Sequence, residues 1–218
     1  MTHHLEISSW NSWGFSGRSL FHLHTDFTDG ELSVKQYFEF ASKQGIEQLI
    51  FLEHIRREPT YDVGQFVFKV KHYAEVYGIE GIVGFEAKLL PRGELDIRRE
   101  HVELAKFIGI AEHGFPEDVK LLVEAFRSVL ERYPGEYSLQ QFVWVHPGLW
   151  FKRRGKLNHP AYRHMVKLAR GSPVWIERNL RYELPSWDIV GYESERVVVG
   201  IDSHSAKDLA RYFQQEAS

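Results

Sequence analysis

The chain contains no cysteine, and this absence removes several classes of site. Disulfide frameworks, zinc ribbons and thiol nucleophiles all require cysteine, so none of them is open to this protein. Any bound metal must be held by nitrogen and oxygen ligands. The absence also fits a reducing compartment, and we expect a cytoplasmic protein.

Long apolar runs and a strong net charge are also lacking. Without a run of roughly eighteen apolar residues, no membrane span is expected. The segment 1–13 does not have the basic-then-apolar order of a secretory signal, and His3 and His4 are given no role. A formal net charge of −3 provides no basic field for nucleic acid or a membrane. The 218 residues, 43% of them hydrophobic, suit one domain over 1–218 with an N-terminal extension over 1–18.

Short apolar runs alternate with longer amphipathic segments along the chain. Strands are expected at 19–24, 48–53, 81–86, 107–111, 141–145, 174–177 and 197–201, and helices at 33–44, 62–77, 98–105, 116–133, 160–169 and 206–213. Ser33 is a good N-cap and Gly45 a natural stop for the first helix. The alternation indicates an α/β fold with a largely parallel sheet, which seven strands could close into a barrel or leave open.

Ionisable side chains collect where these expected strands end. The set is His22, His24, Asp29, His54, Glu86, His113, His146, Asp202 and His204. In parallel α/β folds the carboxyl ends of the strands share one rim, and active sites form there. The remaining internal histidines, which are His72, His101, His159 and His164, lie on or next to expected helices and are left out of the site.

The spacing of this set favours a metal site. His22 and His24, and likewise Asp202 and His204, are two residues apart, so in an extended chain each pair points to one side. Packing so many imidazoles and carboxylates on one rim would be costly without a cation. The sequence therefore predicts a cluster of divalent metal ions.

The motifs together resemble the PHP (polymerase and histidinol phosphatase) superfamily. The relevant segments are His22-Leu23-His24-Thr25 with Asp29-Gly30, Leu52-Glu53-His54, Glu86, His113, Val145-His146-Pro147-Gly148 and Gly200-Ile201-Asp202-Ser203-His204-Ser205. They follow the family's order from about 19 to 208. One departure is Glu53, where the family usually has aspartate.

The resemblance implies a distorted (β/α)7 barrel with three divalent ions, Zn, Mn or Fe. His22, His24, Glu86 and Asp202 would hold one ion; Glu86, His113 and His146 a second; and Asp29, His54 and His204 a third. The implied activity is phosphoester hydrolysis by a metal-activated hydroxide. Glu86, Asp202 and His204 are expected to act at the reacting centre, and the expected partner is a small phosphorylated molecule.

Basic residues after several strands could bind the phosphate. They are Arg56, Arg57, Lys88, Arg92, Lys152, Arg153, Arg154, Arg178 and Arg181. Arg178 and Arg181, with Asn179 between them, are the preferred substrate-binding residues, because strand 174–177 otherwise supplies no ligand.

Three other functions stay open at this point. A nucleotide or DNA phosphodiesterase or exonuclease of the same family would need a basic groove with a stacking platform, which the acidic balance does not favour. A metal-dependent amidohydrolase commonly adds a metal-bridging lysine, for which no strand end offers a persuasive candidate. A non-catalytic metal-bound module would bind metal without turnover.

Overall fold

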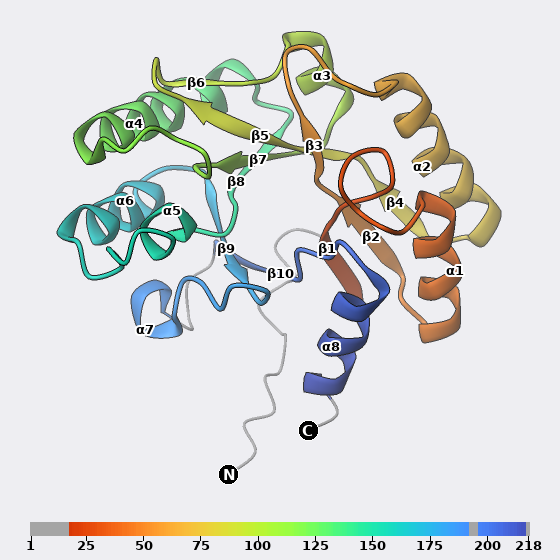
Figure 1. Ribbon diagram of the computed structural model, residues 1–218. Coiled ribbons are helices and arrows are strands. Elements are labelled where there is room, and N and C mark those ends of the chain that lie inside the picture. Colours follow the sequence, from red (N-terminus) through yellow and green to blue (C-terminus); the bar gives the residue numbers. More distant parts are fainter. Residues whose placement is uncertain (1–17, 192–195, 217–218) are drawn as a thin grey trace.

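A ring of strands surrounded by helices forms the described part of the chain, which in this computed structural model covers residues 18–191 and 196–216 (Figure 1). The predicted extension over 1–18 lies almost entirely outside these residues. The strands are β1 (Ser19–Leu23), β2 (Gln48–Phe51), β3 (Glu53–Ile55), β4 (Glu80–Ile82), β5 (Gly84–Leu90), β6 (Glu94–Leu95), β7 (Phe107–Ala111), β8 (Gln141–Trp144), β9 (Trp175–Asn179) and β10 (Val197–Gly200). The helices are α1 (Val34–Gln44), α2 (Val63–Tyr77), α3 (Arg99–Leu104), α4 (Val119–Glu136), α5 (Leu149–Lys152), α6 (Pro160–Arg170), α7 (Trp187–Val190) and α8 (Ala206–Glu216).

The strands pair in parallel in two sheets, apart from the β5–β6 hairpin. One sheet has the order β1-β2-β4, and the other runs β10-β9-β8-β7-β5-β3, with β6 paired to β5. Because β3 follows β2 and β5 follows β4 almost directly, each of these pairs is one bent strand that passes from the first sheet to the second. This gives seven strand positions, as predicted.

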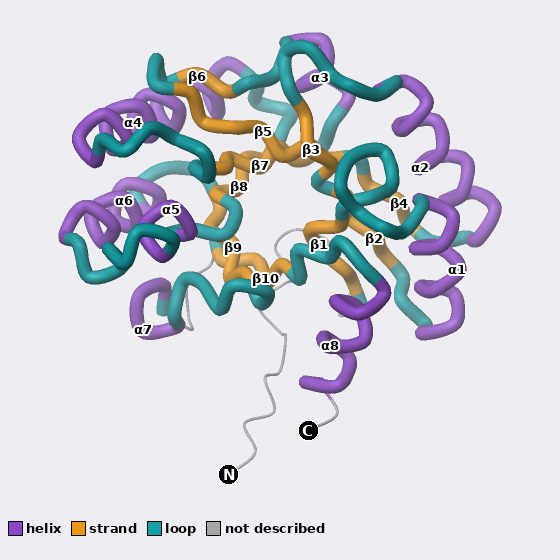
Figure 2. Tube along the Cα trace, viewed as in Figure 1, coloured by secondary structure: helices purple, strands orange, loops and turns teal. Residues whose placement is uncertain are grey.

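A seam between β1 and β10 joins the two sheets on the other side. Leu23 and Ser203 form an isolated parallel bridge. The His24 amide donates to the Ser203 carbonyl at 2.9 Å, and the Ser203 amide donates to the His22 carbonyl at 3.0 Å. The result is a distorted barrel whose two sheets meet here through a few hydrogen bonds instead of a continuous ladder, with the helices outside the strands (Figure 2).

Most predicted helices and strands are confirmed with shifted ends. Helix α1 has Ser33 as its N-cap, in a reciprocal capping box with Gln36, and ends at Gly45 in the left-handed region. Helix α4 starts one residue after Asp118, whose side chain caps it, and continues past the predicted end through Pro134. The predicted strands 48–53 and 81–86 are each divided, because the bent strands change partners between the sheets.

Two apolar clusters hold the barrel together. The larger lies between strands and helices, and the smaller contains strand residues such as Phe21, Ile50, Phe107 and Val143. All four are at most 1% exposed, and burial of this kind contributes roughly 1.5–3 kcal/mol for each large side chain. No helix among the described residues is both long and apolar enough to cross a membrane.

Candidate metal centre

All nine predicted ligands meet at the carboxyl ends of the strands. Their donor atoms fall into overlapping groups in which every atom lies within 4.8 Å of the others. The groups are His24, Asp29, His54 and His204; His22, His24 and Asp202; His22, Glu86 and His146; and His54, Glu86 and His113. Separations of this size allow one ion to contact all members of a group.

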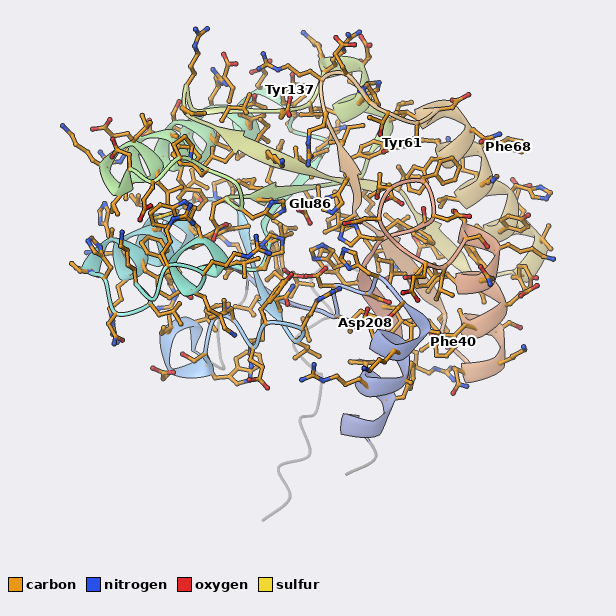
Figure 3. All side chains as sticks on the ribbon, in the orientation of Figure 1. Phe40, Tyr61, Phe68, Glu86, Tyr137 and Asp208 are labelled. Carbon is orange, nitrogen blue, oxygen red and sulfur yellow. The ribbon has the colours of Figure 1, made fainter. Side chains whose placement is uncertain are left out.

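Glu86 on β5 is the centre of the cluster, and Figure 3 places it toward the middle of the strand ring. Its carboxylate lies 2.6 Å from His113 Nε2, 3.0 Å from His22 Nε2 and 3.4 Å from His146 Nε2. The side chain is 1% exposed. Burial by itself would raise the pKa of Glu86, but His54 and His146 outweigh burial and hold it well below its usual value.

His22 and His24 reach the cluster because β1 is irregular. His22 has a φ of 74°, and the pairing of β1 with β2 changes register between Phe21 and Leu23. This bulge interrupts the alternation of side chains. Leu23 packs in the outer core, whereas the His22 and His24 Nε2 atoms lie 3.0 Å apart.

Asp29 is presented by a tight loop after β1. At Gly30 a Cβ would lie 2.4 Å from the His24 carbonyl oxygen, so no larger residue fits this loop. Buried Glu53 holds the loop: its carboxylate accepts the Thr25 amide at 2.9 Å and the hydroxyls of Thr25 and Thr28. The family departure at Glu53 therefore lies beneath the loop instead of among the ligand groups.

The imidazoles differ in their affinity for protons. Burial works against the charged form of His146, but Glu86 outweighs it and raises the pKa to about 9. For His22, burial is likewise outweighed, by Glu177 and Asp202, and the pKa is well above the usual value. For His54, Glu86 and Asp29 outweigh burial and raise the pKa. Burial and the neighbouring His54 and His22 instead lower the pKa of His24. The cluster therefore holds protons that a cation would displace.

The residues fit divalent ions. The Nδ1 atoms of His24, His54 and His146 are buried and have no hydrogen-bond partner among the described residues, although such atoms in proteins are nearly always satisfied. The donors are imidazole nitrogens and carboxylate oxygens, which suit zinc, manganese or iron. A metal ion would offset both the charge and the missing partners.

The predicted substrate-binding residues do not line the cavity above these ligands. Asn179 is fully buried and donates to Asp202 Oδ2 at 3.2 Å. Arg181 donates to the Asp202 carbonyl at 3.0 Å and lies 2.6 Å from His204 Nδ1. Arg178 donates to the Asn179 carbonyl and lies over the Trp187 ring. Asn179 and Arg181 thus contact the ligands Asp202 and His204 from behind.

A cavity of about 130 Å³ opens above the ligands. Its wall consists of Asp29, His54, Glu86, His113, His146, Arg153, Tyr182, Asp202 and His204. Arg153 follows the His-Pro-Gly turn and was one of several basic candidates in the sequence, whereas Tyr182 was not anticipated. Among the nine ligands, exposure is greatest at Asp29, whose side chain is 58% exposed, so the mouth lies on its side of the cluster.

Three buried carboxylates near the ligands had no role in the sequence reasoning. Besides Glu53, they are Glu177, which lies 2.6 Å from His22 Nδ1, and Glu112, which accepts the Trp144 indole and the Gly148 amide at 2.8 Å each. Each of these glutamates ends or directly follows an apolar strand segment in the sequence. That position could have indicated a functional contact, because a buried acidic side chain needs a partner.

Comparisons with known proteins concern the fold and the family of the chain. No significant match was found among curated proteins. The crystal structure of hisK from Listeria monocytogenes, described as a candidate histidinol phosphatase, matches with a TM-score of 0.65 and 15% identity over 90% of this chain and 99% of that chain. Phospho-2-dehydro-3-deoxyheptonate aldolase from Thermotoga maritima gives a TM-score of only 0.42, with 12% identity over 93% of this chain and 69% of that one, and carries no weight. The family model of the PHP domain matches residues 21–174, and the chain therefore belongs to the PHP family.

Proposed function

We propose that this protein is a metal-dependent phosphoesterase that hydrolyses a small phosphomonoester. The observation that carries the proposal is the convergence of nine nitrogen and oxygen ligands with Glu86 at their centre, seven of which line a small cavity. Membership of the PHP family and the description of the hisK protein both support this activity.

Three ions are proposed, divided as the family resemblance implies. His22, His24, Glu86 and Asp202 would hold one; Glu86, His113 and His146 a second; and Asp29, His54 and His204 a third. The ligand groups contain Asp29, His54 and His204 together, and His22, His24 and Asp202 together. They place Glu86 with His22 and His146 in one group and with His54 and His113 in another, so Glu86 is shared as the division requires. The chemistry that divalent ions supply in such a site is activation of water at neutral pH and polarisation of a phosphoryl oxygen.

Arg153 is the proposed phosphate-binding residue. A guanidinium offers two parallel N–H donors that match a pair of phosphate oxygens, and this one lines the cavity. Glu86, Asp202 and His204 line the same cavity and would surround the reacting phosphorus. Burial raises the pKa of Tyr182, so its hydroxyl stays protonated and can donate a hydrogen bond to the substrate.

The size of the cavity favours a monoester. Its 130 Å³ is well below the roughly 300–1,000 Å³ of pockets that enclose a drug-sized ligand. A phosphoryl group fits inside, and the remainder of the substrate would lie at the mouth. Among the described residues, Tyr182 is the single aromatic ring other than histidine in the cavity wall, so a stacking platform for successive bases is missing.

A substrate panel on metal-reconstituted protein tests the proposal. Phosphomonoesters, a dinucleotide and an amide substrate are assayed side by side, and bound metals are counted by elemental analysis. We expect turnover of monoesters above the others. Faster cleavage of the dinucleotide would indicate a phosphodiesterase, amide turnover an amidohydrolase, and bound metal without turnover a binding module; each of these results contradicts the proposal.

The Arg153→Ala variant tests the phosphate contact. Loss of a charge-assisted hydrogen bond costs about 1.5–3 kcal/mol, which corresponds to a fall in kcat/KM of roughly 10- to 100-fold. Arg163→Ala is the matched control, because Arg163 is exposed on α6 and is not in the cavity wall. An Arg153→Ala variant as active as this control would exclude Arg153 from phosphate binding.

A further inference from the structure

Glu177 on β9 is a fully buried carboxylate that contacts two of the proposed metal ligands and is absent from the cavity wall. We propose that Glu177 is a positioning residue that fixes the tautomer of His22 and anchors the backbone of His146 for metal binding. This inference rests on the proposed metal centre and deepens it.

One oxygen of Glu177 sets the state of His22. Oε1 lies 2.6 Å from His22 Nδ1, and a carboxylate can only accept, so Nδ1 carries the proton and donates it. The lone pair of His22 is then on Nε2, which faces Glu86 Oε2 at 3.0 Å and Asp202 Oδ1 at 3.9 Å. Metal-binding histidines are commonly oriented by such a carboxylate on the opposite ring nitrogen.

The other oxygen connects two further strands. Oε2 accepts the His146 backbone amide at 2.5 Å and the Asn179 side-chain amide at 3.0 Å. The same Asn179 amide donates to Asp202 Oδ2 at 3.2 Å. A single carboxylate therefore joins ligands that follow or lie on β1, β8 and β10.

The three ligands in this network share an unusual backbone conformation. The φ angles are 74° at His22, 33° at His146 and 50° at Asp202. For residues other than glycine, this left-handed region is unfavourable and persists only where the surroundings impose it. Glu177 bonds to two of them directly and to the third through Asn179, so it helps to impose all three.

Gly200 on β10 provides the space for this carboxylate. A Cβ at Gly200 would lie 1.7 Å from Glu177 Oε1, which no real structure can accommodate. Gly200 thus leaves room for the Glu177 carboxylate, which orients His22. A methyl at position 200 should displace Glu177 and act like a change of Glu177 itself.

The first test is Glu177→Gln, because glutamine keeps the size but has one donor and one acceptor. If its oxygen accepts from His146 and Asn179, its amide donates to His22 Nδ1 and moves the His22 proton to Nε2. ¹⁵N NMR of the metal-free protein, recorded at a pH above the raised pKa of His22 so that its imidazole is neutral, should show this change of tautomer. Calorimetric titration with Mn²⁺ should show about 10- to 100-fold weaker binding.

A double-mutant cycle with Gly200→Ala separates positioning from general destabilisation. If both changes act on one carboxylate, the double variant loses no more Mn²⁺ affinity than either single variant, whereas independent effects would add. Glu112→Gln is the matched control, since it changes an equally buried carboxylate that bonds to Trp144 and Gly148 instead of a ligand side chain. It should lower the melting temperature and keep the Mn²⁺ affinity.

The outcomes distinguish this inference from the proposed function. If the unmodified protein binds no Mn²⁺, the metal centre itself is wrong. If it binds Mn²⁺ and Glu177→Gln leaves both the His22 tautomer and the affinity unchanged, the positioning role is overturned. Additive losses in the cycle, or an equal loss of affinity in Glu112→Gln, would also overturn it.

Discussion

Metal binding to this cluster should release protons, and the raised pKa values of its histidines indicate how many. At pH 7.5 a group with a pKa of about 9, such as His146, is nearly fully protonated. His22 has a pKa raised well above its usual value and adds a second proton. The pKa of His54 is also raised, so His54 adds part of a third proton. Since a metal binds only deprotonated imidazole, we expect at least two protons to be released when Mn²⁺ binds at pH 7.5.

The same linkage fixes the pH dependence of the affinity. Each released proton changes the binding constant about tenfold per pH unit, so two protons predict a roughly hundredfold weaker Mn²⁺ affinity at pH 6.5 than at pH 7.5. As the pH rises through about 9, the His146 contribution to proton release should disappear.

Calorimetry in several buffers measures this release directly. The apparent enthalpy of Mn²⁺ binding is plotted against the ionisation enthalpy of each buffer at pH 7.5, and the slope is the number of protons. A slope of two or slightly more agrees with the expected proton release. A slope near zero, with an affinity that does not change between pH 6.5 and 7.5, would show that the cluster is already unprotonated and refute it.

Three further predictions concern stability. In the metal-free protein, the pKa of Glu86 is lowered by folding, so Glu86 stabilises the fold at pH values above the pKa that it has in the unfolded chain. This stabilisation is lost as the pH falls. The pKa of His146 is raised by folding, so His146 stabilises the fold fully below about pH 6.5 and loses this effect as the pH rises through 9. The melting temperature with chelator present should therefore fall on both sides, and a rise between pH 7 and 9 would contradict this. Tyr37→Phe removes a buried hydroxyl that donates to the β1 and β10 segments, so urea denaturation should show a loss of about 1–3 kcal/mol, and an unchanged midpoint would count against it. Glu53→Gln can still accept from Thr25 and donate to Thr28, so it should cost less in thermal melts than Glu53→Ala, and equal losses would exclude these bonds as the reason.

The convergence of the nine candidate ligands could be predicted from sequence because strand periodicity and strand ends depend on local pattern. Apolar runs located the carboxyl ends, and parallel pairing brought His54, Glu86 and His113 to one rim. Helix ends such as Ser33 and Gly45 could also be predicted, since capping depends on neighbouring residues. His159, which was left out of the site, lies at the start of α6, where its ring accepts the Ala161 amide.

The orientation of the side chains at this rim could not be predicted from the sequence. Several arginines follow strands, but only the three-dimensional course of the segment after β8 decides that Arg153 lines the cavity while Arg181 bonds to the backbone of Asp202. The sequence marks Glu177 only as an acidic residue in an apolar strand, because its contact with Gly200 depends on the pairing of β9 with β10. Such pairings are tertiary properties that no local pattern contains.

The seam between β1 and β10 has a consequence for when the proposed metal centre could bind its ions. His24, from an early strand, shares its ligand groups with Asp202 and His204, and the β1 backbone bonds to Ser203 between them. During synthesis, residues 202–204 are still inside the ribosome when most ligands have already emerged. In the proposed metal centre, binding of all the ions would therefore have to wait until residues 202–204 have been translated, and a chain that ends before them would have an incomplete site.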